Sequence, residues 1–583
     1  MLEKEAADLF REALHFEEVG NKLAASQIYE QLLHYFPARS SVLINLSENY
    51  ISLKNDERLK ELLPKLEVIQ HPLAKLNAGT IYYNQQKRNI ALEFFQKAFD
   101  LDPNNQEILQ SLAVCLFKLK KPQLAAEFAE KLAYLSTSPI DFGRAAYYYA
   151  SACDWPNELR IRNLTTSIFP FFGISRNLYE HQNLSDAEAY APKEKVSLAL
   201  NFDSYVGLHD LNSHKLRIGY LCGEFREHAT LKLLISVFEH HAHETFEVFY
   251  FDNGISDNSI YRQRLEATSG TIISIRDKSD AYVLAEIKRL KIDLLINLNG
   301  YFGNGRNELF FERAAPIQVS YLGYPATLGH PNIDYLIADS VTIPDENLHY
   351  FTERIYRLPL CYQPNDDKRP KARPTTREKY GLPEGLFIFC CLNNSYKLTR
   401  DTFEAWATIL QKSVNTSLLL LADNDDAKRN IIEAAEAFNV GDRICFIERL
   451  PTLDYVDLLS LCDLFLDTFP YNAHTTASDA LWAGTPILTM PGETFPSRVA
   501  HSLILRAGLD AELYVASSRQ DYISKALFLT ENPQIVEKSK AFMRTKIDIE
   551  GGFVDMLTYT KHLEEAYISM FQTYLKEWKK NGQ

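Results

Sequence analysis

The spacing of apolar residues divides the chain into two regions of different character. Up to about residue 165 the apolar positions follow a helical period, without strand-like alternation. From Lys215 onward, short apolar runs such as 216–221 and 246–252 alternate with helical segments, and this alternation restarts at Leu386. Strands that alternate with helices are typical of parallel, doubly wound sheets. The pattern therefore predicts a helical region followed by two α/β domains in series.

The helical region contains a repeat. Small residues recur at Ala13, Ser47, Gly79 and Ala113, at intervals of 34, 32 and 34 residues by subtraction, although the unit at 46–69 is degenerate. The pattern resembles the tetratricopeptide repeat, whose small residues let the two helices of a hairpin approach closely. An irregular helical bundle is the alternative. Stacked hairpins form a groove that commonly binds another polypeptide, so we expect acceptor proteins or peptides as partners.

These patterns predict four segments. Residues 1–165 form the repeat array with its capping helices, and 166–214 form a polar, aperiodic linker. Residues 215–375 and 376–583 form an N-terminal and a C-terminal Rossmann-like domain, and the second one ends in further helices. Ligands of such open sheets lie beyond the carboxyl ends of the strands, so we expect a cleft between the two domains.

Composition excludes several classes of function. The formal net charge of −14 argues against a nucleic-acid binder that neutralises phosphates. Eight cysteines show no CxxC pair, and most lie inside apolar runs, which predicts free thiols in a reducing compartment. The acidic, amphipathic N-terminus is not that of a signal peptide, and apolar stretches stay shorter than the roughly 18 residues of a membrane span. We therefore expect a cytoplasmic protein.

The stretch 461–498 predicts an anion site. An apolar strand at 464–467 leads into a loop with Asn472, and a helix begins around His474-Thr475-Thr476. A second short strand, 486–490, runs into another loop. Free N–H groups and the positive end of the helix dipole suit a phosphate, so we expect a nucleotide diphosphate here. Neither a GxGxxG fingerprint nor a Walker loop is present.

Two further turns admit two interpretations each. The acidic run 423–426 could suggest a metal site, but it follows a strand and precedes a helix, which favours a solvated loop with an N-cap. The turn 492–494 (Gly-Glu-Thr) could contribute to the nucleotide pocket or serve only as a cap.

Four stretches carry a resemblance to a known family, namely 217–230, 297–329, 392–410 and 462–500. With the repeat array in front of them, they resemble the protein O-GlcNAc transferases (glycosyltransferase family 41), in particular bacterial-type members with a short array. The resemblance implies a GT-B fold of two Rossmann-like domains. It also implies an inverting, metal-independent transfer of a sugar, GlcNAc being expected, from a UDP-sugar to protein side chains, Ser/Thr before Asn. No cofactor and no metal are implied.

Lys397 is the candidate for stabilising the leaving diphosphate. A lysine beside a pyrophosphate offsets the charge that develops in the transition state. The alternative, an exposed lysine at a helix start, fits poorly because a cation there opposes the helix dipole. Asn394, three residues earlier, could hydrogen-bond the diphosphate or the uridine.

The remaining donor contacts are expected in the second domain. At the helix start formed by His474, Thr475 and Thr476, the threonine hydroxyls and the N–H groups suit the β-phosphate, although Thr475 could instead be an ordinary N-cap. By the resemblance, Asp479 accepts from the ribose hydroxyls and the backbone of Leu450 reads the uracil edge. Where many members of the family have a histidine and a lysine in the uridine loop, this chain has Thr452 and Tyr455.

The acceptor side is expected in the first domain. His228 follows the first strand, and an imidazole has the pKa range of a general base. A positioning or substrate-binding role is the alternative, and His228-Ala229 departs from the family's usual His-Pro. The segment Gly323-Tyr324-Pro325 is expected to bring the backbone close to the sugar and the acceptor.

The sequence is also compatible with three other functions. One is a UDP-glucose-dependent protein N-glycosyltransferase. Another is a non-catalytic tetratricopeptide scaffold with a vestigial nucleotide-sugar domain. A third is a nucleotide-sugar epimerase built from two Rossmann-like domains. The repeat array favours a macromolecular acceptor over the epimerase.

Overall fold

The computed structural model describes residues 3–165, 169–192, 215–546 and 552–581. The chain forms two compact units: one consists of 1–166 with 424–430, the other of 167–423 with 431–583. Among the described residues, none of the helices is both long and apolar enough to cross a membrane.

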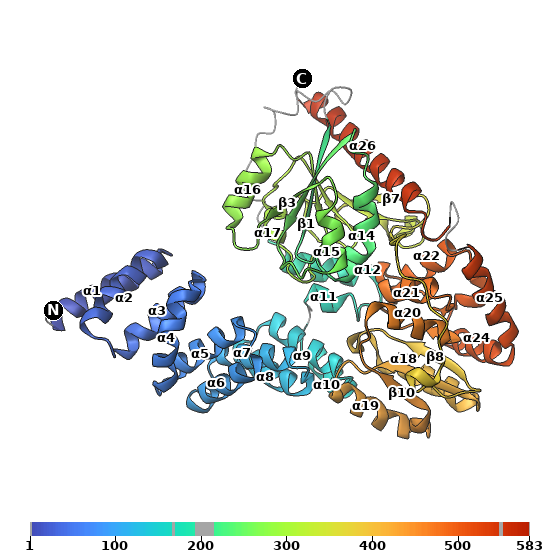
Figure 1. Cartoon of the computed structure of the whole chain (residues 1–583), viewed down its shortest axis with the longest axis horizontal. Coiled ribbons are helices and arrows are strands. Elements are labelled where there is room, and N and C mark those ends of the chain that lie inside the picture. Colours follow the sequence, from blue (N-terminus) through green and yellow to red (C-terminus); the bar gives the residue numbers. More distant parts are fainter. Residues whose placement is uncertain (1–2, 166–168, 193–214, 547–551, 582–583) are drawn as a thin grey trace. The chain divides into compact units, whose positions relative to one another are not determined.

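The first unit is an array of antiparallel helices, drawn from blue to cyan in Figure 1. Small residues stand where paired helices meet: a Cβ on Gly79 would lie 2.6 Å from the Phe95 ring, and Ala13 and Ala113 are fully buried. The predicted helical repeat is therefore confirmed. Its helices are α1 (Glu3–Glu18), α2 (Lys22–Tyr35), α3 (Ser40–Ser52), α4 (Asp56–Val68), α5 (Pro72–Asn84), α6 (Arg88–Leu101), α7 (Gln106–Lys118), α8 (Pro122–Ser136), α9 (Pro139–Ser151) and α10 (Trp155–Arg162).

The hairpin turns carry a second repeat that the sequence pattern did not reveal. A residue with positive φ links the two helices of each of the first four hairpins: Gly20 (78°), Lys54 (53°), Gln86 (63°) and Lys120 (61°). By subtraction their intervals are 34, 32 and 34 residues, the same as those of the small residues. Only the first is a glycine, the residue that adopts this conformation without strain, so composition alone does not mark these turns. The degenerate unit, 46–69, shares the turn.

The first half of the second unit has a seven-stranded parallel sheet in the order β3-β2-β1-β4-β5-β6-β7. Its strands are β1 (Leu216–Cys222), β2 (Phe246–Asp252), β3 (Thr271–Ser274), β4 (Leu294–Asn297), β5 (Ile317–Ser320), β6 (Tyr335–Ala338) and β7 (Arg354–Arg357). Its helices are α14 (Ala229–His240), α15 (Ile260–Glu266), α16 (Asp280–Arg289), α17 (Asn307–Phe311) and the 3₁₀ helix η1 (Asp345–Tyr350).

The second half has a five-stranded parallel sheet in the order β10-β9-β8-β11-β12. Its strands are β8 (Phe387–Cys391), β9 (Thr416–Leu421), β10 (Ile444–Ile447), β11 (Leu464–Leu466) and β12 (Ile487–Leu488). Its helices are α18 (Arg400–Lys412), α19 (Asp425–Glu436), α20 (Thr452–Leu461), α21 (Thr475–Trp482), α22 (Val499–Arg506), α23 (Ala511–Tyr514), α24 (Arg519–Glu531) and α25 (Pro533–Lys546), and its 3₁₀ helices are η2 (Glu378–Tyr380), η3 (Ser395–Lys397), η4 (Gly441–Arg443) and η5 (Phe495–Ser497).

Both sheets reverse their strand order next to the first strand, between β1 and β4 and between β8 and β11. Such a switch point leaves a crevice at the carboxyl ends of the strands. Two parallel sheets with covering helices agree with the predicted GT-B architecture, so the fold prediction is confirmed.

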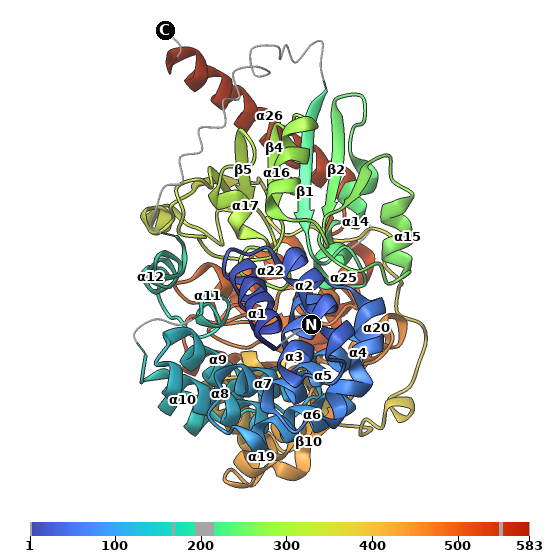
Figure 2. The ribbon, with the colours of Figure 1, turned by 90° about the vertical axis from the view of Figure 1, so that its left-hand side faces the viewer.

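The last helix, α26 (Met556–Asn581), belongs by sequence to the second half but packs on the first (Figures 1 and 2). The Tyr559 hydroxyl lies 2.6 Å from the Tyr321 hydroxyl, and Glu564 Oε1 lies 3.0 Å from Nδ1 of the buried His241. These contacts place α26 against the first sheet although it follows the second sheet in the sequence. Residues far apart in the chain complete this core, which local periodicity cannot indicate.

The predicted linker, 166–214, is not wholly aperiodic. It contains α11 (Pro170–Gly173) and α12 (Glu180–Tyr190), while 166–168 and 193–214 lie outside the described residues. Polar residues, among them Glu180, Asn183 and Asp186, face inward on α12. A helix that buries polar groups shows no apolar stripe, which explains why the sequence pattern missed it.

Candidate functional site

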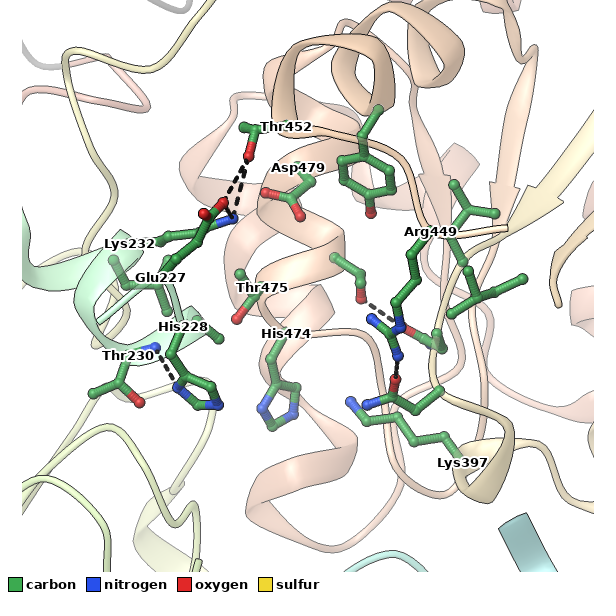
Figure 3. Close-up of a pocket in the computed structure, with 18 of the residues that line it drawn as sticks. Glu227, His228, Thr230, Lys232, Lys397, Arg449, Thr452, His474, Thr475 and Asp479 are labelled. Atoms are coloured by element: carbon green, nitrogen blue, oxygen red, sulfur yellow. Dashed lines mark hydrogen bonds and ion pairs between the residues drawn. The ribbon is translucent and has the colours of Figure 1, made fainter. Parts of the chain in front are cut away.

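A cavity of about 600 Å³ lies between the two halves of the second unit. His228 and the 322–325 loop line it from the first half, and α20, α21 and the loop after β8 line it from the second. The structure brings most of the predicted site residues into this one cavity. Figure 3 labels His228, Lys397, His474, Thr475 and Asp479. Five others also line the cavity, namely Gly323, Pro325, Asn394, Leu450 and Thr476.

Tyr324 is the exception, because it does not line the cavity. Its side chain is 2% exposed and packs edge to face against Tyr301, with ring centroids 5.3 Å apart. The neighbouring glycine explains the close approach of this loop: a Cβ on Gly323 would lie 1.9 Å from the Leu298 carbonyl oxygen. Only glycine fits there, and the loop then presents Gly323 and Pro325 to the cavity.

Lys397 is a buried cation at the cavity wall. It ends η3, the 3₁₀ helix that follows β8, and is 7% exposed. Its Nζ donates to the Asn472 carbonyl at 2.7 Å and lies 3.9 Å from the centroid of the Tyr471 ring. Burial lowers the pKa of Lys397 to about 8, although the carboxylate of Asp467 opposes this shift. A buried ammonium at a cavity wall is suited to an anionic ligand.

Asp467, which the sequence interpretation did not single out, holds the loop that carries this site. It follows β11, is fully buried, and accepts from the N–H groups of Thr468 at 2.8 Å and Ala473 at 2.6 Å. The Thr489 hydroxyl donates to it at 2.6 Å. Burial raises the pKa of Asp467, and the charge of Lys397 opposes the shift. The carboxylate thus fixes the backbone that leads into α21.

The N-terminus of α21 faces the cavity with its N–H groups. His474 is the N-cap residue and makes no side-chain capping bond, so Thr475 is the first helical residue and not the cap. His474 Nε2 lies 3.0 Å from the Pro496 carbonyl, which can only accept, so Nε2 carries the proton. Burial, together with the charge of Lys397, lowers the pKa of His474 well below its usual value. The ring is therefore neutral, and its Nδ1 is an acceptor.

Asp479 lies one turn further along α21, next to Thr475 and Thr476 on the helix surface. It forms an ion pair with Arg369, whose guanidinium lies 5.9 Å from the Trp482 ring centroid. The Arg369 side chain is 12% exposed and comes from the segment that connects the two halves. Sequence reasoning missed this arginine because no motif surrounds it.

His228 is the N-cap of α14, and its ring stacks on Phe302 with centroids 5.4 Å apart. Its Nδ1 accepts from the Thr230 N–H at 3.3 Å, so in the neutral ring Nε2 carries the proton. Burial lowers the pKa of His228, which keeps the ring neutral. In this arrangement the imidazole offers a donor to the cavity, and its unprotonated nitrogen is occupied.

Leu450, Thr452 and Tyr455, which the resemblance assigns to the uridine loop, also line the cavity. Arg449 lies beside them and donates to Asn394 Oδ1 at 2.7 Å and to Asp423 at 3.0 Å. Asn394 is therefore already bonded to an arginine that the sequence interpretation did not name.

The turns at 423–426 and 492–494, for which the sequence allowed two interpretations, are both caps in the structure. Asn424 Oδ1 accepts from the Ala427 N–H at 2.7 Å at the start of α19. Ser497 Oγ accepts from the N–H groups of Gly492 at 3.0 Å and Thr494 at 3.1 Å, and the turn 492–494 does not line the cavity. Within the described ranges, no cluster of three or more His, Cys, Asp or Glu side chains could hold a metal ion.

Comparison with known proteins identifies the family. The family model described as Glycosyl transferase family 41 matches residues 189–370 and 366–563. The probable UDP-N-acetylglucosamine–peptide N-acetylglucosaminyltransferase SEC of Arabidopsis thaliana is 36% identical over 369 residues, which is 62% of this chain and 37% of that protein. The probable UDP-N-acetylglucosamine–peptide N-acetylglucosaminyltransferase SPINDLY of Hordeum vulgare is 28% identical over 372 residues, which is 62% of this chain and 38% of that protein.

The chain thus spans less than half the length of these plant relatives. A solved structure of an O-GlcNAc transferase mutant from Thermobaculum terrenum matches 98% of both chains, with a TM-score of 0.58 and 23% identity, and so has the same fold. Because the family model covers more than half of its residues, the chain belongs to glycosyl transferase family 41.

Proposed function

We propose that this protein transfers a sugar from a UDP-sugar to side chains of acceptor proteins. The observation that carries the proposal is the juxtaposition of a buried lysine, Lys397, with the N-terminus of α21 at one wall of the cavity. A diphosphate bound there would receive a cation and N–H donors together. The printed names of the relatives, which are UDP-N-acetylglucosamine–peptide transferases, support GlcNAc as the sugar.

The leaving diphosphate gains negative charge as the glycosidic bond breaks. Lys397 is placed to offset this charge, and the N–H groups of Thr475 and Thr476 add the positive end of the helix dipole. We therefore propose a metal-independent reaction in which these groups supply the positive charge that a divalent ion supplies elsewhere. Asp479, oriented by Arg369, would accept from the ribose hydroxyls.

Inversion requires the acceptor to approach from the face of the sugar opposite the diphosphate. His228 lines that cavity from the first half, across from Lys397 (Figure 3). Since its Nδ1 accepts from the Thr230 N–H, its Nε2–H is placed to orient the sugar or the acceptor oxygen. We assign His228 a positioning role and prefer Ser/Thr acceptors to Asn. The repeat array would recruit the acceptor protein.

The proposal is tested with the full chain, a panel of UDP-sugars and a cell lysate as the source of acceptors. We expect UDP release and, by mass spectrometry, peptides that carry N-acetylhexosamine on Ser or Thr. A substitution of Lys397 by Met should lower both roughly 10²- to 10³-fold. Failure of every UDP-sugar to bind or to release UDP would overturn the proposal, and hexose on Asn would replace the sugar and the acceptor that we propose.

A further inference from the structure

The nucleoside end of the cavity contains a cation that comes from the opposite half. Lys232 lies on α14 in the first half, and its Nζ is 3.3 Å from the hydroxyl of Thr452, the first residue of α20 in the second half. Glu227, which precedes α14, lies 3.2 Å from the same Nζ and 3.3 Å from the Thr452 hydroxyl. Figure 3 shows the three side chains meeting near Asp479, at the end of the cavity away from Lys397.

The other basic side chains that line the described cavity are engaged elsewhere. Lys397 is bonded to the Asn472 carbonyl, and Arg449 to Asn394 and Asp423. Arg369 forms the ion pair with Asp479. Thr452, the residue of the second half that contacts Lys232, is uncharged.

The bonds that hold Lys232 are easily exchanged. Both are at the long end of the hydrogen-bond range, and the side chains of Lys232 and Glu227 are 30% and 49% exposed. An ion pair between exposed groups contributes little to stability because solvent screens it. The Lys232 ammonium also has a cation–π contact within its own half, since Nζ lies 5.3 Å from the Tyr261 ring centroid. A phosphate or a ribose hydroxyl could therefore take the place of Thr452 or Glu227 without disturbing the fold.

We infer that Lys232 binds the nucleoside diphosphate of the sugar donor. It does so from the first half, opposite the phosphate site at the start of α21. With the phosphates at the start of α21 and the ribose at Asp479, the nucleotide extends along the cavity toward the Lys232 ammonium. One ligand then contacts both walls at once, so the bound nucleotide links the two halves. This inference rests on the proposed function, because it takes the nucleotide position from it.

The test is a calorimetric titration of the full chain with UDP. We expect Lys232→Met, which keeps an unbranched apolar side chain but removes the ammonium, to weaken UDP binding about tenfold, as expected for the loss of one charge-assisted hydrogen bond. Lys278→Met is the matched control, since Lys278 Nζ lies 5.2 Å from the Tyr282 ring in the same half but outside the cavity. It should bind UDP within twofold of the unchanged protein.

A double variant, Lys232→Met with Thr452→Lys, returns the charge from the second half and should recover most of the lost affinity. Equal UDP affinity of Lys232→Met and the unchanged protein would overturn the inference and leave the proposed function standing. If the unchanged protein did not bind UDP, both would fall. Should Lys232→Met melt at a lower temperature, Lys232→Gln, which keeps a donor but no charge, decides by the same titration.

Discussion

The two walls of the cavity are built in opposite ways. In the second half, Lys397 and Asp467 are buried, and short hydrogen bonds tie them to the loop before α21. In the first half, Glu227 and Lys232 are partly exposed and are held by longer bonds that reach across to Thr452. The wall in the second half is therefore preorganised to stabilise charge, as transition-state stabilisation requires. The wall in the first half can exchange its hydrogen-bond partners when a ligand binds.

The largest effect is expected from the preorganised wall. Lys397→Met removes the cation but keeps the apolar stem, and should lower kcat roughly 10²- to 10³-fold, as loss of a transition-state hydrogen-bond donor does. UDP release measured over a range of donor concentrations checks this. Lys412→Met, at the exposed C-terminus of α18, is the control and should leave kcat unchanged. If kcat of Lys397→Met stayed within threefold of the unchanged protein, the distinction between a preorganised and an adaptable wall would not hold.

Asp467→Asn should have the next largest effect, on stability rather than on one catalytic step. The amide cannot accept all the bonds that the carboxylate accepts, and it leaves the buried Lys397 without its countercharge. We expect the free energy of unfolding to fall by about 3 kcal/mol, measured by denaturant titration. Glu227→Gln is the counterpart on the exposed wall, where the change should stay within about 0.5 kcal/mol. Equal losses of unfolding free energy in Asp467→Asn and Glu227→Gln would contradict the difference between the two walls.

His228→Asn separates structure from chemistry on the adaptable wall. Asparagine keeps an N-cap acceptor for the Thr230 N–H, so α14 should remain intact. A positioning role predicts that kcat/KM falls roughly tenfold, because the enzyme loses about one uncharged hydrogen bond that orients the substrate. A general base would lose about 10²- to 10⁴-fold. Steady-state kinetics with a peptide acceptor decides between the two, and circular dichroism verifies the helix.

The smallest effect concerns pH. Burial lowers the pKa of Lys397 to about 8, so the free enzyme loses the required positive charge as pH rises through that value. We expect kcat/KM to be full below it and to decline above it. A bound diphosphate favours the charged form, so the decline of kcat should begin at higher pH. A kcat/KM that stays flat up to about pH 10, the ordinary value for lysine, would contradict this assignment.

Much of this organisation was predictable from local patterns. Helical and α/β periodicity indicated the repeat array and the two sheets. The lysine after β8 and the residues at the start of α21 follow strands directly, so the parallel topology alone brings Lys397 and Thr475 to the same edge. Lys232 and Arg369 could not be found in this way. They reach the cavity through contacts between segments far apart in the chain, and nothing in their neighbourhood marks them.

The path of α26 has a consequence for how the molecule is made. Because Tyr559 and Tyr567 are buried against a half whose own strands end at Arg357, the first half lacks part of its core until residues 556–581 have been synthesised. The portion synthesised earlier must wait for a portion synthesised about 200 residues later. The two halves thus mature together, and a chain that stopped short of Met556 would be damaged in the half most distant from the break in sequence.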